Sequence, residues 1–190
     1  SNAKFLSKDV ITEFRGRGDE IRITPLSFQE FMSAKEGNRE DLLNEYLTYG
    51  GLPQVATMDE PERKVEYLKN LFTHTYIRDI KERYEIKKDD DLEELISLVA
   101  SNIGSLTNPT KLENSFKSVK QSSLTKDTIK SYLYLMQDAF IIEKSIRFDI
   151  KGKKYIDTPS KYYFTDLGLR NARLNFRQTE FTHLLENAIY

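Results

Sequence analysis

Apolar residues recur at steps of three and four along most of the chain, and this spacing is the strongest constraint on its fold. A helix with 3.6 residues per turn brings such positions onto one face. Between Pro61 and Tyr84 the apolar positions are Val65, Leu68, Phe72, Tyr76 and Ile80, so the spacing predicts one long helix over 61–84. Further helices are expected over 4–14, from Ser27, over 38–49, 92–103, 109–116 and 123–137, from Asp166 and over 181–190. The predicted fold class is therefore mainly α.

Composition excludes several classes of protein and site. Of the 190 residues, 38% are hydrophobic and 31% are charged, which is typical of a soluble globular chain. There is no cysteine, and His74 and His183 are the only histidines, so disulfides, thiolate chemistry, iron–sulfur clusters and cysteine- or histidine-rich metal sites are excluded. No apolar run approaches the roughly 20 residues that span a bilayer, and no signal segment is present. We therefore expect no membrane insertion and a cytoplasmic location.

The order of the elements changes after the charged stretch 86–91, where we expect a domain boundary. Three predicted helices are followed by two β-rich runs, 140–146 and 161–165, which flank a basic turn at 151–154. Helix, helix, helix, strand, wing and strand is the order of a winged helix. Residues 90–165 are thus predicted to form a winged-helix domain with a small β wing.

Positive charge is concentrated in this region. The segment from Lys111 to Lys161 contains eleven basic and six acidic residues, although the whole chain has a formal net charge of -1. In a winged helix the third helix enters the major groove and the wing passes the phosphate backbone. The candidate nucleic-acid contacts are Lys126 and Lys130 on the third helix and Lys151, Lys153 and Lys154 on the wing. The alternative is a solvated or protein-binding face, which Asp127 in its middle and the absence of arginine on that helix favour.

No complete active site is visible in the sequence. A phosphate-binding loop needs small residues whose N–H groups surround the phosphates, together with a lysine. Gly16 and Gly18 give only a Gly-x-Gly, because Ile21 stands where a third glycine would fall. The acidic run 89–91 suits solvation or the start of a helix better than a cation site. We therefore assign no catalytic residue and no metal ligand, and whether the whole protein is an enzyme stays open.

Several short motifs, spread over nearly the whole chain, together resemble a known family. The motifs are residues 1–7, Gly16-Arg17 before 21–31, Tyr49-Gly50-Gly51-Leu52-Pro53, 76–80, 100–105 and 161–171. They are similar to segments of divergent, signalling-ATPase-like AAA-type ATP-binding proteins of bacteria and archaea. In that family a P-loop domain precedes a helical lid, a winged helix and a nuclease-like C-terminal region.

The resemblance implies a division of the chain into four parts. Residues 1–37 would be the end of the ATPase core, 38–86 the helical lid, 90–165 the winged helix, and 166–190 trailing helices that begin the C-terminal region. The phosphate-binding loop and the magnesium-binding strand are absent, so ATP and Mg²⁺ are expected in the full-length protein and no cofactor in this chain. The expected partners are the missing ATPase core and C-terminal region of the same protein.

The resemblance also implies where a nucleotide would contact this chain. In the family the loop that resembles Gly50, Gly51, Leu52 and Pro53 approaches the adenine, and a glycine pair would permit such close contact. The alternative is an ordinary helix end and turn. Arg17 resembles an arginine near the phosphates or a subunit boundary, and its alternative is a solvated loop residue.

The expected function is that of a lid and winged-helix regulatory segment of an ATP-binding protein, which is not an ATPase by itself. The rival functions are a stand-alone DNA-binding regulator and a protein-interaction module. Ser1-Asn2-Ala3 is either native or left by tag cleavage, and the uncapped helical pattern that ends at Tyr190 suggests that the sequence continues beyond it. The oligomeric state is not indicated by the sequence.

Overall fold

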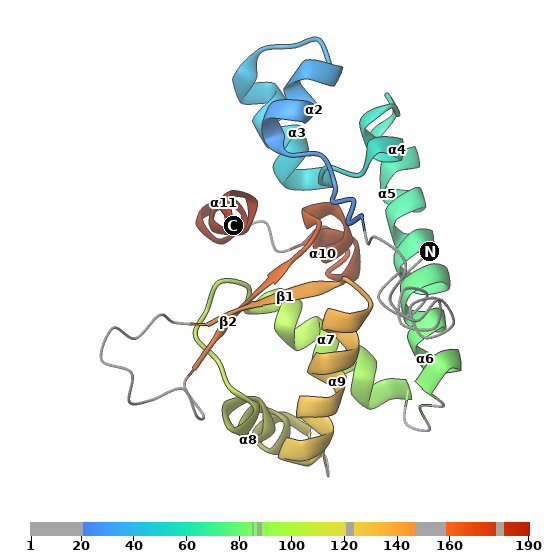
Figure 1. The fold of residues 1–190 in the computed structure, drawn as a ribbon. Coiled ribbons are helices and arrows are strands. Elements are labelled where there is room, and N and C mark those ends of the chain that lie inside the picture. The colour runs from blue at the N-terminus through green and yellow to red at the C-terminus, as the bar shows by residue number, and fades with distance from the viewer. Residues whose placement is uncertain (1–20, 85, 87–88, 121–123, 147–158, 178–180) are drawn as a thin grey trace.

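The protein is described by a computed structural model, in which residues 21–84, 86, 89–120, 124–146, 159–177 and 181–190 are placed well enough to describe. Most of the described residues are helical, and the described strands form one small antiparallel sheet (Figure 1). The prediction of a mainly α fold is confirmed. The described helices are α2 (Phe28–Ala34), α3 (Arg39–Tyr49), α4 (Pro53–Ala56), α5 (Pro61–Asn70), η1 (Leu71–Ile77), α6 (Arg78–Tyr84), α7 (Asp89–Ser101), α8 (Pro109–Lys120), α9 (Lys126–Asp138), α10 (Leu167–Arg173) and α11 (Phe181–Ile189).

Local sequence signals explain how the first helices begin and end. Ser27 caps α2: its hydroxyl accepts a hydrogen bond from the Glu30 N–H at 3.3 Å, and the Glu30 carboxylate accepts one from the Ser27 N–H at 2.8 Å. Asn38 caps α3: its side-chain oxygen accepts a hydrogen bond from the Asp41 N–H at 2.9 Å. Gly50 ends α3 with a φ of 79°, a left-handed conformation that glycine adopts without strain.

The helix predicted over 61–84 is present but not uniform. It runs as α5, η1 and α6, and η1 is a π-helical stretch of seven residues. The apolar spacing predicts the buried face of this element, including Leu68, Phe72 and Ile80. It does not distinguish a π turn from an α turn, and π turns are rare.

The alternation of apolar and charged residues at 20–23 favours a strand, but none of the described residues 21–24 belongs to a sheet. The short helix α4 was not predicted, since four residues are too few to show a period.

The sheet pairs β1 (Ile142–Ser145) with β2 (Lys161–Phe164) in antiparallel register, with Ile142 opposite Phe164. A bridge between Thr107 and Ser160 extends the sheet beyond β2, with N–H to C=O distances of 2.9 and 2.8 Å in the two directions. Thr107 lies between α7 and α8. Along the chain the order is therefore α7, the Thr107 bridge, α8, α9, β1 and β2.

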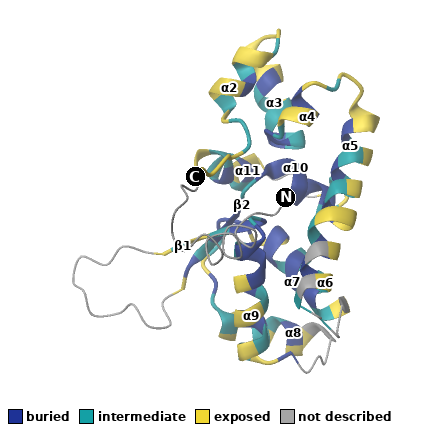
Figure 2. Cartoon of the chain, turned by 45° about the vertical axis from the view of Figure 1, so that its right-hand side comes forward, coloured by how far each residue is buried: buried dark blue, intermediate teal, exposed yellow. Residues whose placement is uncertain are grey.

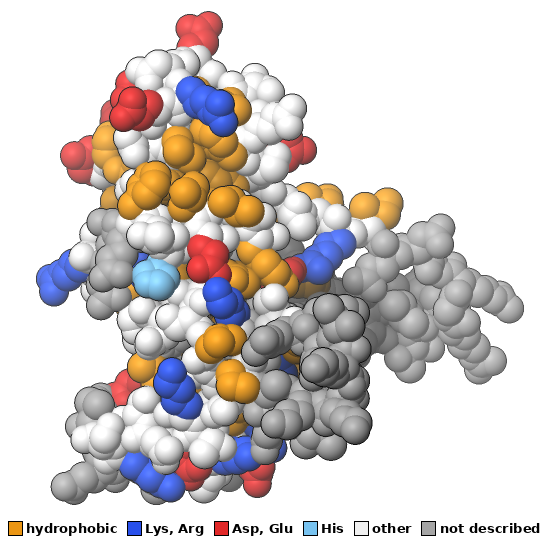
Figure 3. All heavy atoms as spheres, turned by 90° about the vertical axis from the view of Figure 1, so that its left-hand side faces the viewer, with side chains coloured by type: hydrophobic (Ala, Val, Ile, Leu, Met, Phe, Trp, Pro, Cys, Tyr) orange, Lys and Arg blue, Asp and Glu red, His pale blue; other side chains and the backbone are white. Residues whose placement is uncertain are grey.

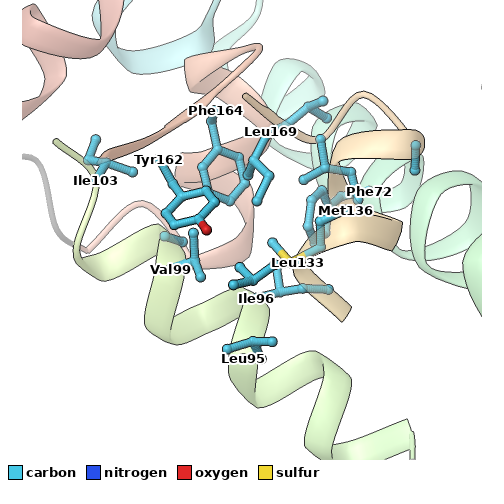
Figure 4. Close-up of a cluster of buried hydrophobic side chains, with 14 of the residues drawn as sticks. Phe72, Leu95, Ile96, Val99, Ile103, Leu133, Met136, Tyr162, Phe164 and Leu169 are labelled. Carbon is cyan, nitrogen blue, oxygen red and sulfur yellow. The ribbon is translucent and has the colours of Figure 1, made fainter. Parts of the chain in front are cut away.

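A single large apolar cluster lies where the helices meet the sheet (Figure 4). It takes Phe72 from η1, Ile96 from α7, Met136 from α9 and Phe164 from β2, and all of these are buried. The cluster contains residues from both sides of the stretch 86–91. A smaller cluster under α2 joins Phe31, Leu42 and Ala56.

Helix α10 lies in the middle of the molecule. It contacts α3, α5, α7, α11, η1 and β2, and all its residues from Leu167 to Ala172 are buried (Figure 2). Because Arg170 and Asn171 are polar, their burial requires hydrogen-bond partners. Those partners belong to other helices and are part of the candidate site.

Candidate functional site

Asp166 lies at the start of α10 and joins it to the loop that follows α3. Its side chain is buried, and one oxygen accepts a hydrogen bond from the Leu169 N–H at 3.0 Å, which caps α10. The other accepts one from the Gly51 N–H at 2.8 Å. Burial raises the pKa of Asp166 to about 6, while hydrogen bonds from the backbone N–H groups of Gly51, Leu169, Gly168 and Leu52 act in the opposite direction.

We call the contact between Asp166 at the start of α10 and the loop Gly50–Gly51 after α3 the joint. The glycines of this joint are required for close packing. A Cβ at Gly50 would lie 2.3 Å from an Asp166 oxygen, and one at Gly51 would lie 2.2 Å from the Leu26 carbonyl oxygen. A Cβ at Gly168 would lie 2.0 Å from the Tyr49 carbonyl oxygen. A side chain at Gly50 or Gly168 would push the α3 loop and α10 apart, and one at Gly51 would displace the backbone at Leu26.

Arg170 and Asn171 connect α10 to the ends of two more helices. The Arg170 Nε donates to the Ala100 carbonyl in the last turn of α7 at 2.9 Å. The Asn171 amide nitrogen donates to the Leu47 and Thr48 carbonyls in the last turn of α3, at 2.9 and 2.8 Å. The last carbonyls of a helix have no partner within the helix, so these two side chains supply what the buried ends of α3 and α7 need.

A cleft of about 990 Å³ opens beside this joint. Its lining includes the segment Ile21–Ser27, the end of β2 and the last residues of α11. Figure 3, which views the molecule from the left-hand side of Figure 1, shows a group of apolar side chains in the upper half of this face. A cleft of this volume falls in the range of small-molecule sites.

The floor of the cleft brings together residues far apart in the sequence. Leu52 and Pro53 line it together with Tyr76 of η1 and Leu169 of α10. No hydrogen bond is recorded for the Tyr76 hydroxyl within the described part of the chain, and burial raises its pKa. The cleft therefore combines aromatic and aliphatic residues.

The structure separates the four residues of the Gly-Gly-Leu-Pro loop into two roles. Gly50 and Gly51 form the end of α3 and the contact with Asp166, as in the alternative that the sequence left open. Leu52 and Pro53 face the cleft, where the predicted nucleotide contact stays a prediction. Arg17 lies outside the described residues.

The predicted nucleic-acid contacts are only partly described. Lys130 is exposed on α9 and lies 3.9 Å from the exposed Asp127, while Lys126 is half-buried. Tyr134 is exposed one turn further along the same helix. Lys151, Lys153 and Lys154 lie outside the described residues.

Sequence reasoning missed the joint and the cleft. Asp166 was expected only as the start of a helix, and its contact with Gly51 spans 115 positions. The signal that could have found the joint is the Asp-x-Gly sequence at 166–168, because it combines a capping residue with a glycine that permits close approach.

Within the described part of the chain, no group of three or more acidic, histidine or cysteine side chains could hold a metal ion. Nor does any described helix have the length and apolar character needed to cross a membrane.

The fold and the joint define a mainly α-helical domain in which a two-stranded sheet packs against α7, α9 and α10. The chain belongs to a family described as "Domain of unknown function (DUF8612)", which matches residues 40–180. This match contains the Gly50–Pro53 loop, Tyr76 and the joint of α10.

Two curated relatives match the chain over its full length. A protein of Haemophilus influenzae, called "Uncharacterized protein", is 36% identical over 195 residues, and the match covers 48% of that relative. A protein of Methanocaldococcus jannaschii, called "Uncharacterized protein MJ1544", is 29% identical over 202 residues, with 45% of it covered. The chain thus spans about half the length of these relatives. No solved structure matches the chain.

Replacing Asp166 by alanine should destabilise the protein more than removing an exposed cap. Asp166→Ala leaves buried N–H groups without an acceptor, and we expect the free energy of unfolding to fall by about 2–3 kcal/mol. The matched control, Ser27→Ala, removes the exposed cap of α2 and should cost about 1 kcal/mol. Urea denaturation at pH 7 measures both, and equal losses would contradict a special role for the joint.

The raised pKa of Asp166 predicts a pH dependence with a defined sign. Between about pH 4 and about pH 6 the unfolded chain releases this proton while the folded chain retains it, so the folded state loses stability as the pH rises. Asp166→Asn cannot titrate and serves as the reference. The free energy of unfolding of the unmodified protein, minus that of Asp166→Asn, should fall through this window. A difference that rises with pH would show that the N–H groups outweigh burial.

Proposed function

We propose that this chain is the lid and winged-helix regulatory segment of a longer ATP-binding protein of the AAA type, and that it is not an ATPase by itself. The observation that carries the proposal is the order of elements from α7 to β2. Three helices precede the antiparallel pair β1 and β2, and Thr107, between the first two helices, forms a single β-bridge with Ser160. This arrangement agrees with the winged helix that follows the lid in the family that the sequence resembles.

The cleft supports the nucleotide part of the proposal. Leu52 and Pro53 offer an apolar surface at its floor, suited to one face of a planar base. The groups that would bind phosphates and Mg²⁺ belong to the ATPase core. The relatives are about twice as long as the chain, which leaves room for such a core in the longer protein.

Calorimetry with ATP and Mg²⁺ tests this proposal. The chain alone should bind ATP very weakly or not at all, because the backbone cradle that holds the phosphates is absent. The longer protein from the complete reading frame should bind ATP. In that protein Pro53→Ala should weaken binding about fivefold, which corresponds to about 1 kcal/mol of lost apolar contact.

Gln54→Ala is the matched control for this substitution. Gln54 is exposed on the same short helix and does not line the cleft, so its replacement should leave ATP affinity unchanged. Gly51→Val would be a poor probe, since its Cβ would collide with the Leu26 carbonyl and disturb the fold. Micromolar binding by the chain alone, or a longer protein that does not bind ATP, would contradict the proposal.

DNA binding by the winged helix is the second candidate function, favoured by the exposed face of α9. Lys130 and Tyr134 lie one turn apart on it, at positions that would face a groove. Asp127 on the same face weakens the case, so we expect weak, poorly sequence-specific and salt-dependent binding.

A gel-shift titration at low salt tests the second candidate. Lys130→Glu should reduce affinity and lower the salt dependence by about one phosphate contact. Arg63→Glu on α5 makes the same change of charge far from α9 in the sequence and should have a smaller effect. No binding by the unmodified chain, or equal losses in the two variants, would leave the winged helix as a protein-binding or connecting domain.

A further inference from the structure

The helices of the lid and those of the winged helix, as the sequence divides them, share one apolar core. Leu68 and Phe72 of the lid are buried in the same cluster as Ile96 and Met136 of the winged helix. Two domains of one chain usually move relative to each other unless the interface between them is large and apolar. A shared core of this kind therefore opposes hinge motion between the two parts.

Direct polar contacts also join the two parts. The Tyr84 hydroxyl of α6 donates to an Asp138 carboxylate oxygen at the end of α9 at 2.9 Å, and Asp138 is buried. The Lys81 Nζ of α6 lies 2.7 Å from a Glu93 oxygen of α7. The other Glu93 oxygen lies 3.3 Å from Arg173 of α10. Lys81, Glu93 and Arg173 thus connect α6, α7 and α10.

Helix α10 completes the connection. Asn171 binds the last turn of α3 and Arg170 binds the last turn of α7, so neighbouring residues of one helix hold an element of each part. The joint adds the contact of Asp166 with Gly51, which directly precedes the cleft residue Leu52. The loop that the proposed nucleotide would contact is therefore attached to α10, and through α10 to the winged helix.

We propose that the lid and the winged helix form one rigid body, so that a movement of the lid produced by nucleotide in the longer protein carries α9 and its exposed face with it. The position of the winged helix relative to the ATPase core then depends on the bound nucleotide. The inference rests on the proposed function for the nucleotide, whereas the rigidity of the body does not. The alternative is a winged helix that moves independently and is joined to the lid only through 86–91.

Distances between two spin labels test the rigidity in the chain alone. The sequence contains no cysteine, so labels attach only at introduced thiols. Glu66→Cys on α5 and Ser131→Cys on α9 place an exposed label on each part. The control pair, Asn114→Cys on α8 with Ser131→Cys, lies within the winged helix and gives the width expected for a rigid unit. The first pair should give a single distance distribution as narrow as that of the control.

A longer connection between the two parts separates the effect of the contacts from that of the covalent link. Three glycines inserted after Ile86 lengthen the link but leave the shared core and the polar contacts in place. The distance between labels at Glu66 and Ser131 should therefore shift by less than about 2 Å, below the size of a domain rearrangement. A broader distribution or a larger shift would show that the link itself sets the placement, and would overturn the inference.

The protein made from the complete reading frame tests the transmission. After removal of any native cysteine, a label in the ATPase core gives the distances from the core to Glu66 and to Ser131, without nucleotide and with ATP and Mg²⁺. Both distances should change by more than about 2 Å, while the distance between the labels at Glu66 and Ser131 stays constant.

Three further results would overturn the inference. In the chain alone, a broad or two-peaked distribution between Glu66 and Ser131 would show a hinge between lid and winged helix. In the longer protein with bound ATP, a change in the distance to Glu66 alone would show the same hinge, and no change in either distance would show that nucleotide does not move the body. A narrow distribution in the chain together with no ATP binding by the longer protein would refute the proposed nucleotide function and leave the rigid body intact.

Discussion

The rest of the structure depends on the burial of three polar side chains on one short helix. Asp166, Arg170 and Asn171 are all almost completely removed from solvent, and each binds backbone groups of a segment more than 60 residues away. Buried polar groups are costly unless they are hydrogen-bonded, so these contacts permit only one relative placement of α3, α7 and α10. Apolar contacts around them supply most of the driving force, but such contacts are less directional. The three side chains thus select the arrangement that the apolar core stabilises.

This role changes how two of the sequence motifs are understood. The motifs around Gly50–Pro53 and Asp166–Asn171 were grouped because they resemble segments of one family, and in the structure they contact each other directly. Most of their polar and glycine residues serve this contact. The two residues of the loop that do not serve this contact, Leu52 and Pro53, line the cleft. A motif can therefore be distinctive because it joins two parts of a fold, with only a few of its residues left for binding.

Features set by neighbouring residues could be predicted from the sequence. The cap of α2 by Ser27 and Glu30 and the order of elements from α7 to β2 depend on spacing of a few positions, and both are present. The unpaired state of Ile21–Thr24 could not be predicted, because alternation describes a strand but does not supply its neighbour. The cleft could not be predicted either, since its walls come from segments between Ile21 and Tyr190. Contacts between segments that are far apart in the sequence are decided by tertiary packing, and local patterns carry no information about them.

The π-helical stretch η1 also limits how this sequence can change in length. A wider turn in a helix contains an additional residue relative to an α-helix. Deleting one residue between Leu71 and Ile77 would remove this additional residue and allow regular α-helical bonding, with α5 and α6 nearly in their present relative orientation. A deletion within α5, which is already α-helical, would instead rotate the residues beyond it by about 100° and move Ile80 out of the main cluster. The loss of one residue should therefore be tolerated better in η1, where Thr73 and Thr75 are exposed, than in α5.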